Sequence, residues 1–231
     1  CQFNYASGVV AAGVAPSRMS FSQSASGSPA ATSVAAAGAA PSSSTTGVLS
    51  GNTLVLNGVG IDAAIGSDDD SSSTYGTSST KAASAIAIAA AINKSSEITG
   101  VTAKANANSI KGSGFTAAAI SSIKLNGIDI TTTLGTSSTR EDVLQIFNSR
   151  SGETGVTATA YGDGIELVAA DGRNISISTD AGGAAAAAGL GLAGMTVGAT
   201  GAETSYYAGV TLTSDKAFSL NSGSEGDTLN F

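Results

Sequence analysis

Two stretches of the chain share one pattern of hydrophobic and polar positions. Apolar and polar residues alternate in Thr53–Asp62 and again in Ser122–Ile130, and Asn-Gly interrupts each alternation. Alternation is typical of a half-buried β-strand. Asn-Gly favours a two-residue hairpin turn, because both residues tolerate the positive φ of a type I′ turn. The pattern therefore predicts a β-hairpin in each stretch.

A helix is expected after each hairpin, first over about Lys81–Asn93 and then over about Arg140–Asn148. The first has isoleucines among alanines, and the second has Val143, Leu144 and Phe147 at i, i+1 and i+4, which gives one apolar stripe to lay on a sheet.

Both predicted helices follow the sequence Thr-Ser-Ser-Thr. Its last threonine, Thr80 or Thr139, is suited to cap the helix, because its hydroxyl can accept a free backbone N–H. Glu141 and Asp142 fall in the first turn of the second helix, where the helix dipole favours negative charge.

Each helix ends in asparagine and a serine-rich turn, followed by Thr-Gly-Val-Thr-Ala at Thr99–Ala103 and Thr154–Ala158. The glycine suits a left-handed exit from the turn, and Val-Thr-Ala favours the start of a strand. The chain therefore contains two copies of a unit made of a β-hairpin, a capped helix and a strand.

Further elements are expected after the second copy. Gly164–Val168 and Asn174–Ser178 alternate cleanly around Asp171-Gly172, which predicts a second hairpin. Ala181–Gly194 has room for a short alanine-rich helix. Two strand-like segments follow, at Val210–Thr213 and Ala217–Leu220.

The first 50 residues carry the weakest structural signal and hold all three prolines. Val9–Val14, and Met19 with Phe21, could be edge strands, and Ser24–Thr46 is typical of a loop or linker. The sequence thus predicts an α+β, mostly β chain of small subdomains in tandem. Their ranges are 1–50, 51–115 (first copy), 116–200 (second copy) and 201–231 (return strands).

The composition supports thin subdomains. Hydrophobic residues make up 42% of 231, but many are alanine, and aromatic residues reach only 5%. The net charge is −7 and the ten basic residues are scattered, so nucleic acid or an anionic membrane is not an expected partner. Cys1 is the single cysteine, which excludes an intrachain disulfide. No apolar stretch reaches the length of a membrane helix, and no Sec-type signal peptide is visible.

The candidate chemistry is sparse. The sequence has no histidine, which removes the commonest general base and zinc ligand. Paired carboxylates remain, but most acids are expected in turns, where they bind the local backbone. These are Asp163, Asp171, Asp180 and Asp215. We therefore expect no enzyme activity and no catalytic, cofactor-binding or metal-binding residue.

Four motifs have a plainer interpretation than a binding site. Gly189–Gly194 matches G-x-G-x-x-G, but an alanine run precedes it where a nucleotide site needs a strand. Asp68–Asp70 lacks the ligand spacing of a calcium loop and favours a solvated acidic tip. Asn93-Lys-Ser95 and Asn174-Ile-Ser176 fit the N-glycosylation sequon. O-glycosylation is the more plausible hypothesis, at the hydroxyl-rich loops 42–46, 71–74 and 77–80.

The repeated motif resembles a known one. Leu-Asn-Gly, then a capped helix ending in Ile92-Asn93 or Phe147-Asn148, then Thr-Gly-Val-Thr-Ala, resembles the flagellin hook IN motif. This motif occurs in the variable part of bacterial flagellins and in hook-associated and cap proteins. Ile165–Ile177 is similar to a hairpin common in flagellins, and Leu190–Leu192 and Leu212–Leu220 resemble flagellin outer-domain ends. The resemblance covers roughly residues 53–220 and does not extend to residues 1–50.

The resemblance implies the outer part of a flagellin, because the heptad helices of the flagellin core are missing here. It implies an extracellular structural subunit of the flagellar filament, which supports motility, assembles with identical subunits into a helix and can carry surface glycans. Two alternatives are a hook-associated or filament-cap protein, and an adhesin or phage-tail binding module.

Overall fold

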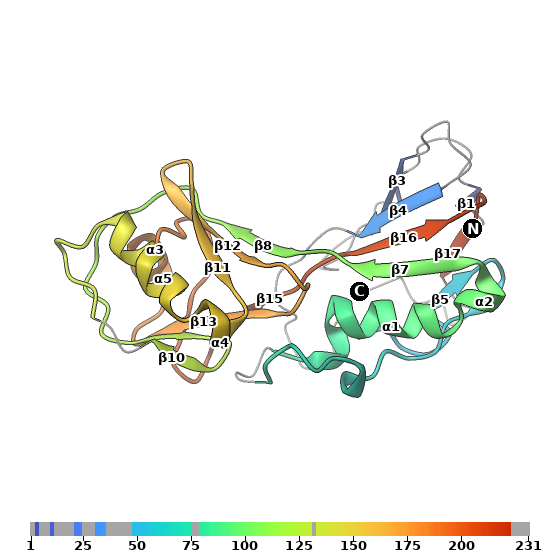
Figure 1. Cartoon of the computed structure of the whole chain (residues 1–231), viewed down its shortest axis with the longest axis horizontal. Helices are drawn as coiled ribbons and strands as arrows, with labels where there is room; N and C mark the ends of the chain where they lie inside the picture. Colours follow the sequence, from blue (N-terminus) through green and yellow to red (C-terminus); the bar gives the residue numbers. More distant parts are fainter. Residues whose placement is uncertain are drawn as a thin grey trace. The chain divides into compact units, whose positions relative to one another are not determined.

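Figure 1 shows the computed structural model of the chain, and its labels are used below. The structure describes residues 48–74, 79–130 and 133–222, and the backbone of four short strands at residues 3–4, 10–11, 21–24 and 31–35. The chain divides into two units. The first is Cys1–Ser71, Thr80–Asn106 and Tyr207–Phe231, and the second is Ser72–Ser79 and Ala107–Tyr206. Both combine short helices with mostly antiparallel strands, so the chain is an α+β protein dominated by small sheets.

Over its described residues, the first unit contains two antiparallel sheets, with strand orders β1-β17-β5-β6 and β2-β3-β4-β16-β7. Helix α1 lies along β7 (Figure 1). The strands are β1 (Phe3–Asn4), β2 (Val10–Ala11), β3 (Phe21–Ser24), β4 (Ala31–Ala35), β5 (Leu54–Leu56), β6 (Val59–Gly60), β7 (Val101–Ala105), β16 (Val210–Ser214) and β17 (Ser219–Ser222). The helices are η1 (Gly66–Asp68), η2 (Lys81–Ala83), α1 (Ala85–Lys94) and α2 (Ser96–Thr99).

Among the described residues of this unit, one hydrophobic core joins α1 to both sheets. Ile88 and Ile92 of α1 are fully buried, and the alanines between them let the helix lie close to the strands. The sheets contribute Leu54, Leu56, Val101, Val210, Leu212 and Leu220. The core is therefore built from aliphatic side chains, as the low aromatic content requires.

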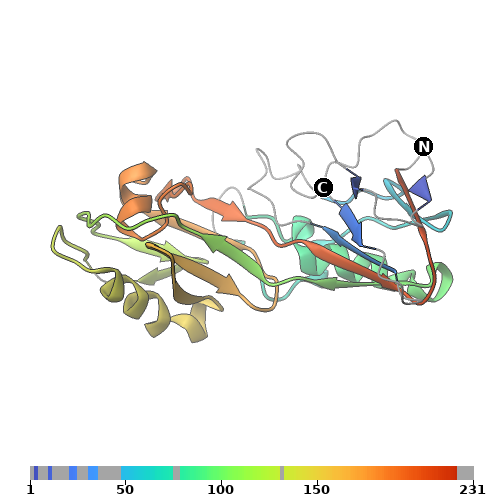
Figure 2. The same ribbon diagram turned by 90° about the horizontal axis from the view of Figure 1, so that it is seen from above.

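The second unit also contains two sheets, β11-β12-β8 and β10-β9-β13-β14, and β15 pairs with β13 as well. Figure 2 shows α3 (yellow) and α5 (orange) on opposite sides of its strands. The strands are β8 (Asn108–Lys111), β9 (Ile123–Leu125), β10 (Ile128–Ile130), β11 (Thr157–Tyr161), β12 (Gly164–Ala169), β13 (Ile175–Thr179), β14 (Gly198–Ala199) and β15 (Thr204–Tyr206). The helices are α3 (Arg140–Ser149), α4 (Ser151–Thr154) and α5 (Gly183–Gly189).

The predicted stripe on α3 is confirmed. Val143, Leu144 and Phe147 are buried, and they belong to one core with Ile165 and Leu167 of β12. Thr139 caps this helix as expected, in a capping box with Asp142. The short alanine-rich helix predicted within Ala181–Gly194 is confirmed as α5.

Both Asn-Gly hairpins are confirmed. Asn57 and Gly58 have φ of 50° and 81°, and Asn126 and Gly127 have 51° and 83°. Positive φ at both central residues is the signature of a type I′ turn. The strands on either side pair antiparallel, β5 with β6 and β9 with β10.

The start of α1 differs from the prediction. Thr80 precedes the short 3-10 helix η2 and makes no side-chain cap bond. Instead Ser84 caps α1, because its Oγ accepts the Ala87 N–H at 3.1 Å. The four extra residues form a separate turn, so the two copies of the motif enter their helices differently.

The hairpin predicted around Asp171-Gly172 is wrong. Strand β12 uses both of its edges on β11 and β8, while β13 pairs with β9, β14 and β15. The turn therefore carries the chain from one sheet to the other. Both segments form strands as predicted, although β13 is buried at every position, and the alternation does not say which neighbour a strand pairs with.

The N-terminal segment contains more strand than the sequence predicts. Strand β4 at Ala31–Ala35 pairs with β3 and β16, so the loop expected over Ser24–Thr46 is wrong there. Strand β2, over 10–11, lies at a sheet edge as expected for Val9–Val14, whereas β3, over 21–24, pairs with both β2 and β4, so the edge position expected for Met19 with Phe21 is wrong. The remainder of those expected segments lies outside the described residues.

The two copies of the motif are nested in the chain. Strands β7 and β16 pair antiparallel, with Ala103 opposite Leu212, although the whole of Ala107–Tyr206 lies between them in sequence. The boundaries expected from the sequence, 51–115, 116–200 and 201–231, differ from this division. Residues 107–115 fall in the second unit, and the return strands β16 and β17 complete the sheets of the first.

Candidate functional site

The asparagine of each Asn-Gly turn links three parts of its unit. In the first unit, Asn57 Nδ2 donates to the Thr99 carbonyl at 2.7 Å, and its Oδ1 accepts the Ser219 N–H at 2.9 Å. The Asn57 backbone N–H also donates to the Ser219 carbonyl at 3.0 Å. The turn is thereby tied to the end of α2 and to strand β17.

The second unit repeats these three bonds. Asn126 Nδ2 donates to the Thr154 carbonyl at 2.9 Å, and its Oδ1 and backbone N–H bond to the N–H and carbonyl of Ser176, each at 2.8 Å. Asn126 is buried, whereas Asn57 is exposed. The same turn residue thus ties the same three elements together in both copies.

The asparagine at the end of each helix has a second repeated role. Asn93 bonds to both the N–H and the carbonyl of Ala103, at 2.7 and 2.8 Å. Asn148 bonds in the same way to Ala158, at 2.8 Å for each bond. The sequence predicts only a helix end at these asparagines and only a turn at each Asn-Gly pair. Their occurrence at equal places in both copies is the sequence signal that points to these contacts.

The exit from each helix matches the prediction. Gly100 and Gly155 have φ of 69° and 70°, and Val101 and Val156 follow each as the chain turns into a strand. Thr99 Oγ1 accepts the Val101 N–H at 3.1 Å, and Thr154 Oγ1 accepts the Val156 N–H at 3.2 Å.

The glycine-rich run Gly189–Gly194 packs backbone against backbone. Helix α5 precedes it, and the Gly191 carbonyl accepts the Ile165 N–H of β12 at 2.9 Å. A Cβ on Gly112 or Gly164 would lie within 2.5 Å of the Gly191 carbonyl oxygen. These glycines let three segments approach closely, which accounts for the G-x-G-x-x-G match without a phosphate ligand.

The acidic run Asp68–Asp70 is only partly the solvated tip that the sequence predicts. Asp70 is exposed, but Asp69 is fully buried and accepts the Ser71 N–H at 2.8 Å. Asp68 Oδ2 lies 2.6 Å from Lys94 Nζ. The prediction is therefore wrong for Asp69, which the fold removes from solvent. No group of three or more acidic, cysteine or histidine residues in the described ranges is placed to hold a metal ion.

The turn acids behave in two ways. Asp171 binds Arg173 through its backbone N–H at 3.1 Å and its guanidinium at 2.6 Å. Burial raises the pKa of Asp171, but these contacts with Arg173 outweigh burial and hold it below the ordinary value. Asp163 and Asp215 also lie in turns and are exposed, but they make no hydrogen bond to the local backbone within the described chain.

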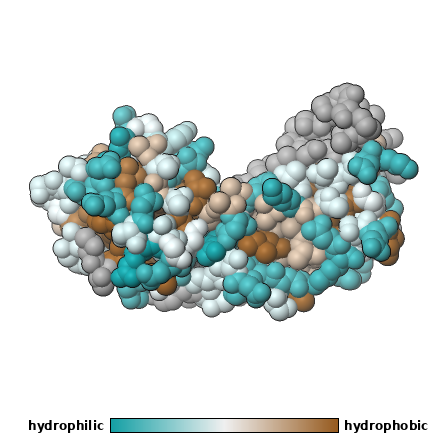
Figure 3. Space-filling model, in the orientation of Figure 1, coloured by the Kyte–Doolittle hydropathy of each residue, from teal (hydrophilic) through white to brown (hydrophobic). Residues whose placement is uncertain are grey.

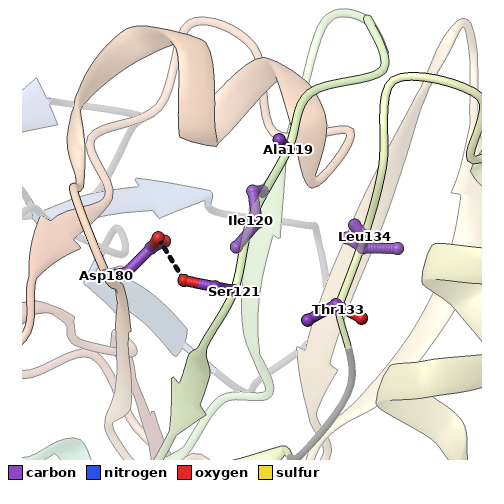
Figure 4. A pocket seen from close by; sticks show the side chains of 6 residues that line it. All are labelled: Ala119, Ile120, Ser121, Thr133, Leu134 and Asp180. Carbon is purple, nitrogen blue, oxygen red and sulfur yellow. Dashed lines mark hydrogen bonds between the residues drawn. The ribbon is translucent and has the colours of Figure 1, made fainter.

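Asp180 lies beside a shallow pocket of about 310 Å³ (Figure 4). Ser121 Oγ donates to Asp180 Oδ2 at 2.5 Å, and this bond lowers the pKa of Asp180. Asp180 is exposed, so this contact is a hydrogen bond at the surface of the unit. The remaining lining residues are Ala119, Ile120, Thr133 and Leu134.

The glycosylation motifs differ in accessibility. Asn174 is fully buried, and the side-chain amide of Asn93 is held by Ala103. Both sequon asparagines are therefore engaged by the fold. In loop 71–74, Ser72 is buried and Thr74 is exposed. Ser79 is also buried, while residues 42–46 and 77–78 lie outside the described ranges.

The exposed large apolar side chains are scattered. Over the described residues they are Ile65, Ile98 and Tyr161, which belong to three different segments. Hydrophilic and hydrophobic residues are interspersed on the face drawn in Figure 3. Single exposed apolar residues of this kind are normal on a surface that faces water.

Comparison of the sequence with models of protein families and with curated proteins finds no match. Over the part of the chain that is described, none of the helices has the length and apolar character needed to cross a bilayer.

Proposed function

We propose that the chain is a surface-exposed outer segment of a bacterial flagellin, the structural subunit of the flagellar filament. The proposal starts from the resemblance of residues 53–220 to flagellin outer regions. The observation that carries it is the repeated hydrogen-bond pattern of the motif. Both copies use the turn asparagine, Asn57 or Asn126, and the helix-end asparagine, Asn93 or Asn148, in the same way. This agreement argues against a chance match in a low-complexity sequence.

The topology of the first unit suits a segment that projects from a longer chain. Strands β1 and β17 are neighbours and antiparallel, with Phe3 opposite Leu220. The chain therefore enters β1 and leaves β17 at the same end of the sheet. Domains inserted into a longer polypeptide commonly have entry and exit points close together.

In this proposal the chain has a mechanical role and no enzymatic one. Its partners are identical subunits of an extracellular helical filament, and its acidic, hydroxyl-rich surface faces the medium. Surface glycans would be carried by exposed hydroxyls such as Thr74. Intact mass of the natively purified subunit tests this last point, because a mass equal to that of the bare polypeptide excludes glycans.

Immunogold electron microscopy of the native cell tests the proposal. Antibodies are raised against the purified chain and applied to intact cells, with a strain that lacks the gene as the control. The proposal predicts gold particles along the whole length of the flagellar filaments. Filaments sheared from the cells should contain the full-length subunit as their main protein.

Other labelling patterns would overturn the proposal. Gold confined to filament tips or to the hook junction would identify a cap or hook-associated protein. Gold on the cell envelope of cells whose filaments are unlabelled would identify an adhesin. Labelling of free phage particles would identify a tail component.

A further inference from the structure

The strands that follow the motif lie at sheet edges. Among the described strands, β7 ends the order β2-β3-β4-β16-β7, and β11 ends the order β11-β12-β8. An edge strand presents unpaired N–H and carbonyl groups that can template pairing with another chain. Identical copies carry identical edges, so a protein present at high local density is most exposed to this hazard.

The outward-facing groups of β11 can be identified from its register. In the register of β11 with β12, Thr157, Thr159 and Tyr161 lie opposite Val168, Glu166 and Gly164, and Ala158 and Ala160 lie opposite Leu167 and Ile165. The N–H and carbonyl of Ala158 bond to the Asn148 side chain, so they point away from β12. In an antiparallel ladder the direction alternates, which makes Val156, Ala158 and Ala160 the outward-facing positions.

Side chains of the motif form hydrogen bonds with the outward-facing backbone groups along this edge. The amide of Asn148 supplies one donor and one acceptor, as one residue of an incoming strand would. Thr154 Oγ1 takes the Val156 N–H at 3.2 Å, and Arg140 Nη1 donates to the Gly162 carbonyl at 2.6 Å. Ala160, between them, makes no such side-chain contact within the described chain.

The first unit has the same arrangement on β7. Asn93 holds Ala103, and Thr99 takes the Val101 N–H. In both copies the asparagine lies at the end of a helix, ten residues before the alanine that it contacts. A one-turn helix, α2 or α4, and a glycine in the left-handed conformation connect that helix to the strand. The spacing of the motif therefore places the amide beside the strand edge.

We infer that the helix-end asparagines Asn93 and Asn148 prevent β-strand pairing between copies of this chain, because their side chains satisfy the backbone groups of the edge strands β7 and β11. The inference rests on these contacts alone and holds whether or not the chain is a flagellin. It assigns a role to the asparagine of the motif, namely to keep neighbouring copies from joining through β7 and β11.

The two edge strands differ in how strongly they should pair with another copy when the asparagine is removed. Val156–Tyr161 reads Val-Thr-Ala-Thr-Ala-Tyr, which has β-branched and aromatic residues, no charge and no proline. Six-residue segments of this composition are prone to form cross-β assemblies. Val101–Ala105 contains Lys104, and a charged residue on an edge strand opposes pairing. Loss of Asn148 should therefore cause more association than loss of Asn93.

The experiment uses the purified chain of 231 residues and the variants Asn148→Ala, Asn93→Ala and Gln145→Ala. Gln145 is exposed on the same helix as Asn148 and makes no hydrogen bond through its side chain, so it is the matched control. Mass is measured by light scattering across a concentration series, and cross-β structure by thioflavin binding. Circular dichroism identifies conditions where each variant is folded.

We expect Asn148→Ala to self-associate and bind thioflavin while folded, with a weaker effect for Asn93→Ala and none for Gln145→Ala. Exchange of the Ala158 amide hydrogen should speed up roughly tenfold, the loss expected for one hydrogen bond. The double variant Asn148→Ala/Ala160→Lys should return to the mass of the parent chain, because a lysine then charges the opened edge.

Two results would overturn the inference. In the first, Asn148→Ala stays monomeric at every concentration although the Ala158 amide hydrogen exchanges faster. The hydrogen bonds between Asn148 and Ala158 would then stabilise the fold without preventing association. In the second, Asn148→Ala associates but Ala160→Lys fails to reverse it, so that association runs through another surface or through unfolded chains.

Discussion

Replacing Asn126 by alanine tests whether the Asn-Gly asparagine holds the second unit together. The substitution removes the two side-chain hydrogen bonds that join the turn to Thr154 and Ser176. It also places alanine at a φ of 51°, a left-handed conformation that asparagine tolerates better. Both effects lower the free energy of unfolding of the second unit.

The magnitude follows from the burial of the groups left behind. Thr154 is fully buried and Ser176 nearly so. An unsatisfied buried donor or acceptor costs about 1–3 kcal/mol, so the pair costs about 2–6 kcal/mol. The left-handed conformation adds about 1 kcal/mol. The expected loss is about 3–7 kcal/mol, a large part of the roughly 5–15 kcal/mol that stabilises a typical domain.

Two further asparagines separate these contributions. Asn52 also has a positive φ of 63°, but it is exposed and its side chain makes no hydrogen bond in the described chain. Asn52→Ala should therefore lose only the backbone term, about 1 kcal/mol. Asn57 makes the same bonds as Asn126 but is exposed, so water can replace them in part. Asn57→Ala should fall between the other two.

Pulsed hydrogen exchange with mass spectrometry over a urea series is the suitable assay, because peptides from each unit report its unfolding separately. If Asn126→Ala loses no more stability in the second unit than Asn52→Ala loses in the first, the hydrogen bonds contribute nothing and the reasoning fails. Asn126→Gly is the internal check, since it relieves the backbone cost but still lacks both bonds.

Three other predictions concern helix capping, backbone packing and the nested order of the units. Hydrogen bonds from the Thr139 backbone and hydroxyl lower the pKa of Asp142. The contribution of Asp142 to stability is therefore full above its ordinary pKa of 3.8 and is lost as the pH falls through the lowered pKa. NMR titration of the parent chain measures the pKa, and melting of Asp142→Ala across pH measures the contribution. Gly191→Ala should destabilise the second unit by about 2 kcal/mol more than Gly201→Ala in urea melts, because both have positive φ but only at Gly191 does a Cβ meet a β12 side chain, at 2.9 Å. Replacing residues 107–206 by a short glycine–serine linker should leave hydrogen exchange in helix α1 as slow as in the parent chain, because the linker rejoins β7 to β16.

The sequence predicts the local elements well because their signals are local. Asn-Gly requires only two residues with positive φ, and the capping box of Thr139 and Asp142 spans one helical turn. The apolar stripe of α3 likewise follows from spacing within ten residues. Each of these predictions depends on neighbours in the chain, and each is confirmed.

Strand pairing could not be predicted in the same way. Ala103 lies opposite Leu212, more than a hundred residues later, and nothing in the alternation of β7 identifies β16 as its partner. The turn at Asp171-Gly172 has the composition of a hairpin but connects two sheets, because the edges of β12 are already occupied. The buried state of Asp69 also depends on tertiary packing.

The asparagine contacts explain why a second copy can be nested within the first without loss of the first core. Every partner of Asn57, namely Thr99 and Ser219, belongs to the first unit, although the insertion separates the two partners in sequence. Every partner of Asn126 belongs to the second. Each network is closed within its own unit, so lengthening the connection between β7 and β16 breaks no bond of the network. The added cost is the closure entropy of a longer loop, and this cost grows only slowly with loop length. Because the inserted residues are themselves folded, they do not add to the flexible part of that loop.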